Sequence, residues 1–240
     1  MSLLTICQNA ARYSGATEIP TVIAGSSNDT ASMLFACADL AGKELARRYN
    51  WLELVTEYTF STVASQQDYD LPSDYKRAVN LTWWDRTNFT QVEGPLSPQQ
   101  WQEQTSSVLA QTSTTWKKYR IRKVSGSTKI SLFPTPDAAD NLVFEYASTS
   151  WCESSGGTGQ DSWQADTDVG RLDEHLIELG TIWRFLDRMG LDYGMAKIEY
   201  EREVNRSIAR DGGAPVINIS RDSSVNLINS KNVPDTGFGS

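Results

Sequence analysis

The sequence predicts an α+β protein in which helices from both ends of the chain form a helical bundle, with an inserted antiparallel β domain and an extended C-terminal arm. Apolar residues recur at helical spacing near both ends and alternate between them, and few of them follow Gly213. We therefore expect a bundle domain at residues 1–52 and 169–212. We expect the β domain, a small sandwich or barrel, at 53–168 with a long loop at 150–168, and the arm at 213–240.

Two helices are predicted at the N-terminal end. The first, from Leu3 to Tyr13, places Leu3, Cys7 and Ala10 on one face and stops before Gly15. Asn28 or Asp29 caps the second helix, which ends near Asn50. The apolar stripe of that second helix comprises Met33, Cys37, Leu40, Ala41, Leu45 and Tyr49.

Period-two alternation follows and predicts a set of strands. The expected strands are Leu54 to Thr62, Val79 to Trp84, Tyr119 to Ile121, Ile130 to Leu132 and Leu142 to Tyr146. A Ser-Gly-Ser turn at 125–127 makes a hairpin of the third and fourth strands. Ser97 and Pro98 predict the start of a short helix, and the Ser/Thr/Gln-rich run from Gln104 to Thr115 predicts a loop. Residues 150–168 are irregular, and a loop of this length is usually functional or mobile.

Two more helices precede the arm. The strongest periodicity in the chain ends at Gly190 and is carried by Leu172, Leu176, Leu179, Trp183 and Leu186. The next helix carries Ala196, Tyr200, Val204 and Ile208 at a spacing of four and ends at Gly212. The arm that follows is rich in Ser, Asn and Gly with scattered apolar residues, so we expect it to order only against a partner.

Composition excludes several classes of function. The chain has 22 Lys+Arg against 30 Asp+Glu, and its net charge of -8 argues against tight binding to nucleic acid. A single histidine excludes a multi-histidine metal site. No apolar run reaches the length of a membrane helix, and the N-terminus lacks a basic region typical of a signal peptide. Three widely spaced cysteines indicate free thiols in a reducing compartment.

Three features are candidate sites of chemistry. His175 follows two acidic residues and could serve as a base, but without a nucleophile signature a surface position is favoured. The acidic cluster from Asp161 to Glu174 could bind calcium, but it departs from the EF-hand pattern, which favours a solvated loop. The glycine-rich run at 156–159 lacks the Lys-Ser/Thr ending of a phosphate loop. We therefore expect no enzymatic activity, cofactor or metal.

The only basic cluster in this acidic chain comprises Lys117, Lys118, Arg120, Arg122, Lys123 and Lys129. On a strand, Lys118, Arg120 and Arg122 share one face. This face is either a solvent-facing edge, where Lys discourages edge pairing, or a contact with an acidic partner or with phosphate.

The chain holds eight tryptophans, most of them in and around the predicted β domain. Clustered tryptophans pack in cores and subunit interfaces, and they also stack on sugars. We favour core and interface. The alternative function is carbohydrate binding or glycan cleavage, with Glu145 and Glu153 as the carboxylate pair.

Several short stretches of the sequence resemble tailed-phage head-to-tail adaptor proteins, the head-completion class that includes podovirus tail tubular protein A. They are the strand with Tyr58 and Phe60, the run Tyr69-Asp70-Leu71-Pro72-Ser73-Asp74 before Arg77, the run Ile130-Ser131-Leu132-Phe133-Pro134-Thr135-Pro136, and Leu142-Val143-Phe144-Glu145-Tyr146. The similarity spans approximately residues 1 to 210. It implies a ring of about twelve subunits below the portal, which extends the DNA channel and provides the platform for tail attachment.

The resemblance also implies partners and a location. The partners are the portal protein, a tail or nozzle protein and further copies of the chain. Genomic DNA passes through the lumen without specific binding, no membrane is involved, and the protein resides in the virion after assembly in the host cytoplasm. From the residues themselves we expect partner contacts at the basic strand face and the apolar positions of the arm: Lys118, Arg120, Arg122, Val225, Leu227, Ile228, Val233, Pro234 and Phe238.

Overall fold

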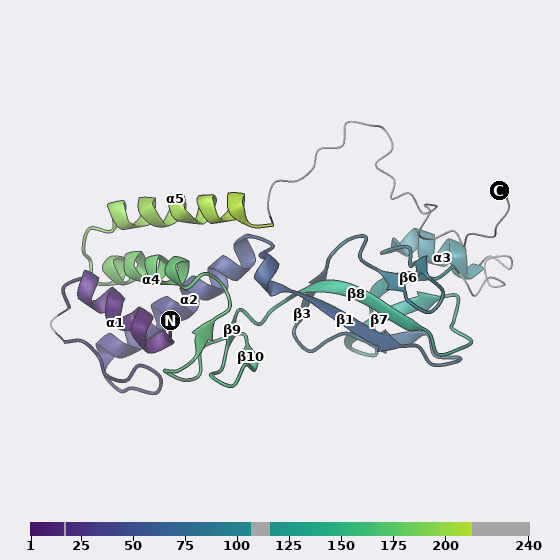
Figure 1. Ribbon diagram of the computed structural model, residues 1–240, viewed down its shortest axis with the longest axis horizontal. Helices are drawn as coiled ribbons and strands as arrows, with labels where there is room; N and C mark the ends of the chain where they lie inside the picture. The colour runs from purple at the N-terminus through teal and green to yellow at the C-terminus, as the bar shows by residue number, and fades with distance from the viewer. Residues whose placement is uncertain (17, 107–115, 213–240) are drawn as a thin grey trace, which may run out of the picture. The chain divides into compact units, whose positions relative to one another are not determined.

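A computed structural model describes residues 1–16, 18–106 and 116–212 (Figure 1). It confirms the α+β class, because helices and antiparallel sheets both make up the described chain. The helices are α1 (Leu3–Tyr13), α2 (Asp29–Arg48), α3 (Pro98–Ser106), α4 (Glu174–Arg188) and α5 (Gly194–Arg210), with a 3₁₀ turn η1 (Leu52–Leu54). Among the described residues, none of these helices combines the length and the hydropathy needed to span a bilayer.

The strands form three sheets. They are β1 (Val55–Ser61), β2 (Asp68–Asp70), β3 (Tyr75–Ala78), β4 (Trp84–Asp85), β5 (Thr90–Gln91), β6 (Lys118–Val124), β7 (Ser127–Phe133), β8 (Asn141–Ser148), β9 (Cys152–Glu153), β10 (Gly159–Gln160) and β11 (Val169–Gly170). One sheet has the order β1-β8-β4-β5 with β3 also on β8, the second β10-β9-β11, and the third β2-β7-β6. The predicted hairpin is confirmed, since β6 and β7 pair antiparallel up to Val124 opposite Ser127.

The chain divides into two compact units. The first contains Met1–Tyr58, Pro72–Asn80 and Glu145–Gly213, and the second contains Thr59–Leu71 and Leu81–Phe144. Each unit is described by itself below.

The first unit is built on the four helices expected from the two ends of the chain. In this unit α4 packs against α1, α2 and α5, as the side-by-side helices in Figure 1 show. Local chemistry sets the helix ends: Asn28 Oδ1 accepts the backbone N–H of Thr30 at 2.8 Å, and Asp173 Oδ1 accepts that of His175 at 3.0 Å. Gly190, with φ +70°, follows the end of α4 as predicted.

The stretch 150–168, expected to be a long irregular loop, contains two short strands. Strands β9 and β10 lie within it, and β11 completes their small sheet. Trp151 and Trp163 meet edge to face, with ring centroids 5.0 Å apart, and both belong to the helical core. Gly42 of α2 makes room for this packing, because a Cβ there would lie 2.0 Å from Cζ3 of Trp151. The apolar side chains of this stretch therefore pack against the helices.

Two smaller expectations are also corrected. No strand spans Val79 to Trp84, because Leu81 adopts φ +63°, a left-handed conformation that breaks an extended chain. The expected loop at Gln104 is instead the last turn of α3, which continues to Ser106. The remainder of that loop, 107–115, and the arm at 213–240 lie outside the described residues.

The second unit has an aromatic core. The ring of Trp83 stacks between those of Tyr119 and Phe144, with centroid distances of 3.8 and 3.9 Å. Across both units, the buried tryptophans are Trp51, Trp83, Trp101, Trp151 and Trp163. Their burial confirms the core interpretation for these five and removes them from any exposed sugar-binding surface.

Candidate functional site

The predicted basic face lies on β6, and two of its three side chains are engaged inside the second unit. Lys118 Nζ lies 3.5 Å from a carboxylate oxygen of Glu93 and 3.3 Å from Gln104 Oε1. Arg122 pairs with Asp68 at 3.3 Å and donates from Nε to Ser131 Oγ at 2.6 Å. Arg120 is half-buried in the same strand, opposite Ser131. The structure therefore brings the three residues together on one strand, with intramolecular ion pairs at two of them.

Lys117 belongs to the predicted basic cluster by sequence but not by environment. Its side chain is only 2% exposed, and its Nζ lies 2.6 Å from Asp85 Oδ2 and 2.7 Å from Asp140 Oδ2. Asn88 completes this buried charge cluster by donating from Nδ2 to Asp85 at 2.9 Å and to Asp140 at 3.1 Å. Two carboxylates and one ammonium, all hydrogen-bonded, form an arrangement in which buried charge is tolerated.

The cluster shifts the ionisation of its members. Burial alone would raise the pKa of the Asp85 carboxyl, but hydrogen bonds from Asn88 and Lys117 outweigh it and hold the pKa below its usual value. Burial alone would lower the pKa of Lys117, but its bonds to Asp140 and Asp85 raise it. Both groups are therefore charged at neutral pH, as a structural ion pair requires.

The acidic residues from Asp161 to Glu174 hold the backbone of the first unit. Asp166 accepts the N–H groups of Ile23 at 3.1 Å and Ala24 at 2.6 Å. Asp168 Oδ2 accepts those of Gln164 and Ala165 at 2.8 and 2.9 Å. Within residues 1–16, 18–106 and 116–212, no three His, Cys, Asp or Glu side chains converge as a metal ion would require.

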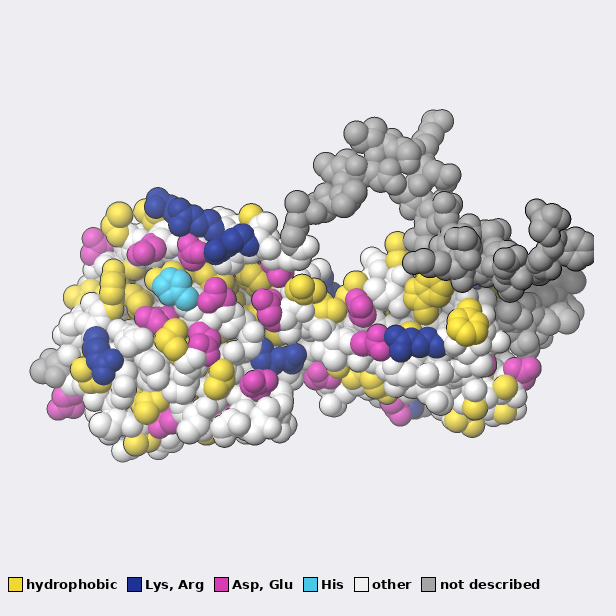
Figure 2. Space-filling view, viewed as in Figure 1, with side chains coloured by type: hydrophobic (Ala, Val, Ile, Leu, Met, Phe, Trp, Pro, Cys, Tyr) yellow, Lys and Arg dark blue, Asp and Glu magenta, His cyan; other side chains and the backbone are white. Residues whose placement is uncertain are grey.

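The candidate catalytic groups are poorly placed for chemistry. His175 is exposed on α4 and shows on the surface in Figure 2. Cys7, Cys37 and Cys152 are buried free thiols. Burial raises the pKa of Cys7 and of Cys152 to about 12 and also raises that of Cys37, so none is a ready thiolate.

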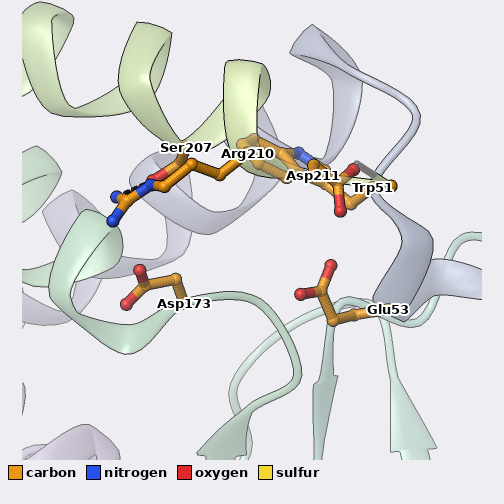
Figure 3. Close-up of a pocket in the computed structure, with 7 residues that line it drawn as sticks. Trp51, Glu53, Asp173, Ser207, Arg210 and Asp211 are labelled. Carbon is orange, nitrogen blue, oxygen red and sulfur yellow. Dashed lines mark hydrogen bonds between the residues drawn. The ribbon is translucent and has the colours of Figure 1, made fainter. Parts of the chain in front are cut away.

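A polar cavity of about 260 Å³ lies where α5 ends, at the root of the expected arm (Figure 3). Glu53 and Asp173 point into it, below Arg210. Asp211 ties this end of α5 to η1, because its carboxylate accepts the N–H of Leu52 at 3.1 Å. Sequence reasoning missed this cavity, since its walls come from three separate stretches of the chain. Among the described residues that line the cavity there is no nucleophile–base pair.

The outer side of α5 carries a line of basic side chains, visible as a dark blue row in Figure 2. Arg202, Arg206 and Arg210 are exposed and recur at a spacing of four, which places them on one helix face. Arg206 and Arg210 both pair with Glu203, at 3.2 and 2.8 Å. Paired surface charges of this kind suit a protein contact better than catalysis.

Comparison with known families identifies the family to which this architecture belongs. A family model described as SU10 adaptor protein matches residues 1–223. The chain belongs to the SU10 adaptor protein family. This is a structural family of phage adaptors, so the chain is a bacteriophage adaptor, a component of the virion that interacts with portal and tail components. The resemblance to head-to-tail adaptors is thereby confirmed at the level of the phage adaptor. No curated protein matches the chain.

The remaining predicted contact residues lie in the arm. Val225, Leu227, Ile228, Val233, Pro234 and Phe238 are outside the described residues. Only Lys118, Arg120 and Arg122 of the predicted partner-binding set are therefore placed by the structure.

Proposed function

We propose that this adaptor is a head-to-tail connector of the podovirus tail tubular protein A class, which forms a ring below the portal and extends the DNA channel. The observation that carries the proposal is the family match over residues 1–223, which covers both the helical unit and the β-rich unit. In this proposal about twelve copies close into a cyclic ring, and the ring is the platform to which the tail attaches. The domain division expected from the sequence, 1–52 with 169–212 and 53–168, is part of the proposal.

Exposed apolar side chains support an assembly. Around the turn from α4 to α5, Leu191 and Tyr193 are exposed, and Met195 and Ile198 follow on one face of α5 with 75% and 53% of their surface accessible. An apolar group of this kind on a soluble protein marks an interaction surface. It supports contact with another protein chain in the virion.

The charge of the chain supports a passive role toward DNA. Each copy carries a net charge of -8, so a ring of about twelve copies is strongly acidic. An acidic lumen repels phosphate, which lets the genome slide without sticking.

The arm and the basic strand are the proposed contacts with other proteins. Ordering of residues 213–240 against the portal would supply affinity, and the ring would multiply weak contacts by avidity. A contact through Lys118 and Arg122 must compete with their pairs to Glu93 and Asp68. Binding through this face is therefore expected to weaken as salt is raised.

The test is mass measurement of the protein alone and mixed with the portal, followed by cryo-electron microscopy of the particle. The proposal requires a closed ring of this chain between portal and tail. A protein that stays monomeric and never joins the portal would overturn it. Binding of glycans by the isolated protein would favour the alternative function, a carbohydrate-binding or glycan-cleaving component of the phage tail.

A further inference from the structure

One cavity of the first unit collects positive side chains, although the chain as a whole is acidic. Its volume is about 310 Å³, and the residues that line it are Lys43, Ala46, Arg47, Lys76, Thr149, Trp151 and Asp161. Lys43 and Arg47 lie one turn apart on α2, and Lys76 comes from β3. With three cations and one carboxylate, the lining carries a net charge of +2. This basic cavity therefore has the opposite sign to the chain, whose net charge is -8.

Two of the three cations in the basic cavity have no carboxylate partner. Lys43 pairs with Asp39 at 2.7 Å. Lys76 donates from Nζ to a backbone oxygen of α2 at 2.5 Å, and among the described residues neither Lys76 nor Arg47 forms an ion pair. Burial lowers the pKa of Lys76, and the positive charges of Arg77 and Arg47 lower it further. Like charges therefore lie close together here, and a bound anion would stabilise them.

The lining of the basic cavity suits the side chain of an acidic residue. Arg47 and Lys76 can donate charge-assisted hydrogen bonds to a carboxylate, while Trp151 and Ala46 provide apolar surface for the methylene groups that carry it. A water molecule takes about 30 Å³ of liquid volume, so the cavity of about 310 Å³ has room for a carboxylate and its methylene groups. Size and chemistry thus agree on a carboxylate side chain as ligand.

The surroundings of the basic cavity favour a protein ligand over DNA. A duplex carries many closely spaced phosphates, and binding it requires a broad basic face. The net charge of -8 and the Asp161 carboxylate in the lining both repel such a polyanion. A single carboxylate senses mainly the cations next to it, because salt screens exposed charges beyond about 8 Å. As a phage adaptor, the chain interacts with portal and tail components, which are proteins.

We propose that the basic cavity formed by Lys43, Arg47 and Lys76 binds an aspartate or glutamate side chain from an acidic segment of a portal or tail component. The opposite charges of the cavity and the segment would align the two proteins and add specificity to their contact. The inference goes beyond the proposed ring and does not depend on it, because it requires only that the adaptor contacts another virion protein.

A short polyglutamate peptide tests the chemistry of the basic cavity. The NMR signal of the Trp151 indole N–H reports binding, because this group lines the cavity and donates to the backbone oxygen of Asp161 at 2.7 Å. We expect the signal to shift with the glutamate peptide and not with a glutamine peptide of the same length. In Arg47→Gln the Kd for the glutamate peptide is expected to rise about tenfold, as for loss of one charge-assisted hydrogen bond.

Arg12→Gln is the matched control for Arg47→Gln. Arg12 is exposed on α1 of the same unit, and its replacement removes the same charge away from the basic cavity, so the Kd is expected to stay within about twofold. Lys76→Gln is a second test, because glutamine keeps a donor for the backbone of α2 and removes the charge. It is expected to weaken binding as Arg47→Gln does. Thermal unfolding checks that all three variants are folded.

Inorganic phosphate and a short DNA duplex are titrated at the same salt concentration. If either binds the basic cavity more tightly than the glutamate peptide, the cavity is a phosphate site and the inference is wrong. The inference is also refuted if the glutamate peptide leaves the Trp151 signal unchanged, or if Arg47→Gln and Arg12→Gln weaken binding equally.

Cross-linking in the phage particle identifies the protein that occupies the basic cavity. A carbodiimide joins an amine directly to a carboxylate that touches it, and mass spectrometry locates the linked residues. We expect Lys76 to be linked to an aspartate or glutamate of a portal or tail component. The pair of Lys43 and Asp39 at 2.7 Å is the internal control, because its link shows that the reagent reaches the cavity. If that link forms and Lys76 is linked only to another copy of this chain, or to nothing, the inference is refuted and the proposed ring is unaffected.

Discussion

Lys117→Met is the substitution whose effect follows most directly from the structure. Methionine keeps most of the length of the side chain but removes the ammonium that lies 2.6 and 2.7 Å from the Asp85 and Asp140 carboxylates. The two carboxylates then face each other with their counter-charge gone, in a site where Lys117 is 2% exposed. Two buried like charges without a counter-charge destabilise a fold strongly.

Removal of one partner of a buried ion pair typically costs about 3–5 kcal/mol. With a urea m-value of about 1–3 kcal/mol/M, this loss lowers the unfolding midpoint by about 1 M or more. Lys118→Met is the matched control, because its pair with Glu93 is 3.5 Å long and the Glu93 side chain is largely exposed. A solvent-screened pair of that kind contributes about 0–1 kcal/mol. Urea unfolding read by hydrogen exchange in peptides of the second unit compares the two.

The change of stability with pH also distinguishes Lys117→Met from the wild type. In the wild type the folded pKa of Asp85 lies below its unfolded value, so its stabilising contribution is present above the unfolded pKa and is lost as pH falls through the folded pKa. In Lys117→Met the ammonium that lowers the Asp85 pKa is gone, so burial is opposed by the hydrogen bonds from Asn88 alone and the Asp85 pKa is expected to rise. The gain of stability with rising pH across the acidic range is therefore expected to be smaller in Lys117→Met than in the wild type, or reversed. Equal midpoints of urea unfolding for Lys117→Met and Lys118→Met, with the same dependence of stability on pH, would refute the reasoning.

Three further predictions follow. Gly42→Ala places a Cβ against the Trp151 ring at 2.0 Å and is expected to cost about 1–3 kcal/mol in thermal unfolding, whereas Gly156→Ala, with its nearest atom at 3.7 Å, is expected to be neutral; equal melting temperatures would contradict the packing described. The three buried thiols are expected to react with a thiol reagent only as the protein unfolds, and rapid labelling of the native protein would show that their burial is wrong. A chain truncated after Gly213 is expected to keep its melting temperature and lose binding to the portal, and undiminished binding would remove the arm from the account.

The helices could be predicted because their determinants are local. Apolar spacing, the Asn28 cap and Gly190 each act within a few residues, and α2 and α4 accordingly begin and end close to the predicted positions. The core of the helical unit also contains two tryptophans that helical periodicity does not predict. Trp151 and Trp163 join its core through contacts with distant residues, which the irregular sequence around them does not encode locally.

The buried charge cluster around Lys117 could not be predicted from the sequence for a similar reason. By sequence, Lys117 is one of several basic residues in a strand, and only the tertiary fold brings it to Asp85 and Asp140. Strand alternation also fails near Leu81, because its left-handed backbone breaks the extended chain. The phage adaptor assignment was accessible, since it depends on short phrases of sequence and on the order of elements.

The central claim is that this adaptor works as a ring between portal and tail. Cryo-electron microscopy of the phage particle, with the chain located by its density, tests it most directly. We expect a closed ring of copies of this chain directly below the portal, with the DNA channel running through its centre. A particle in which the chain occurs as isolated single copies, or in which the portal contacts the tail without it, would refute the proposed ring.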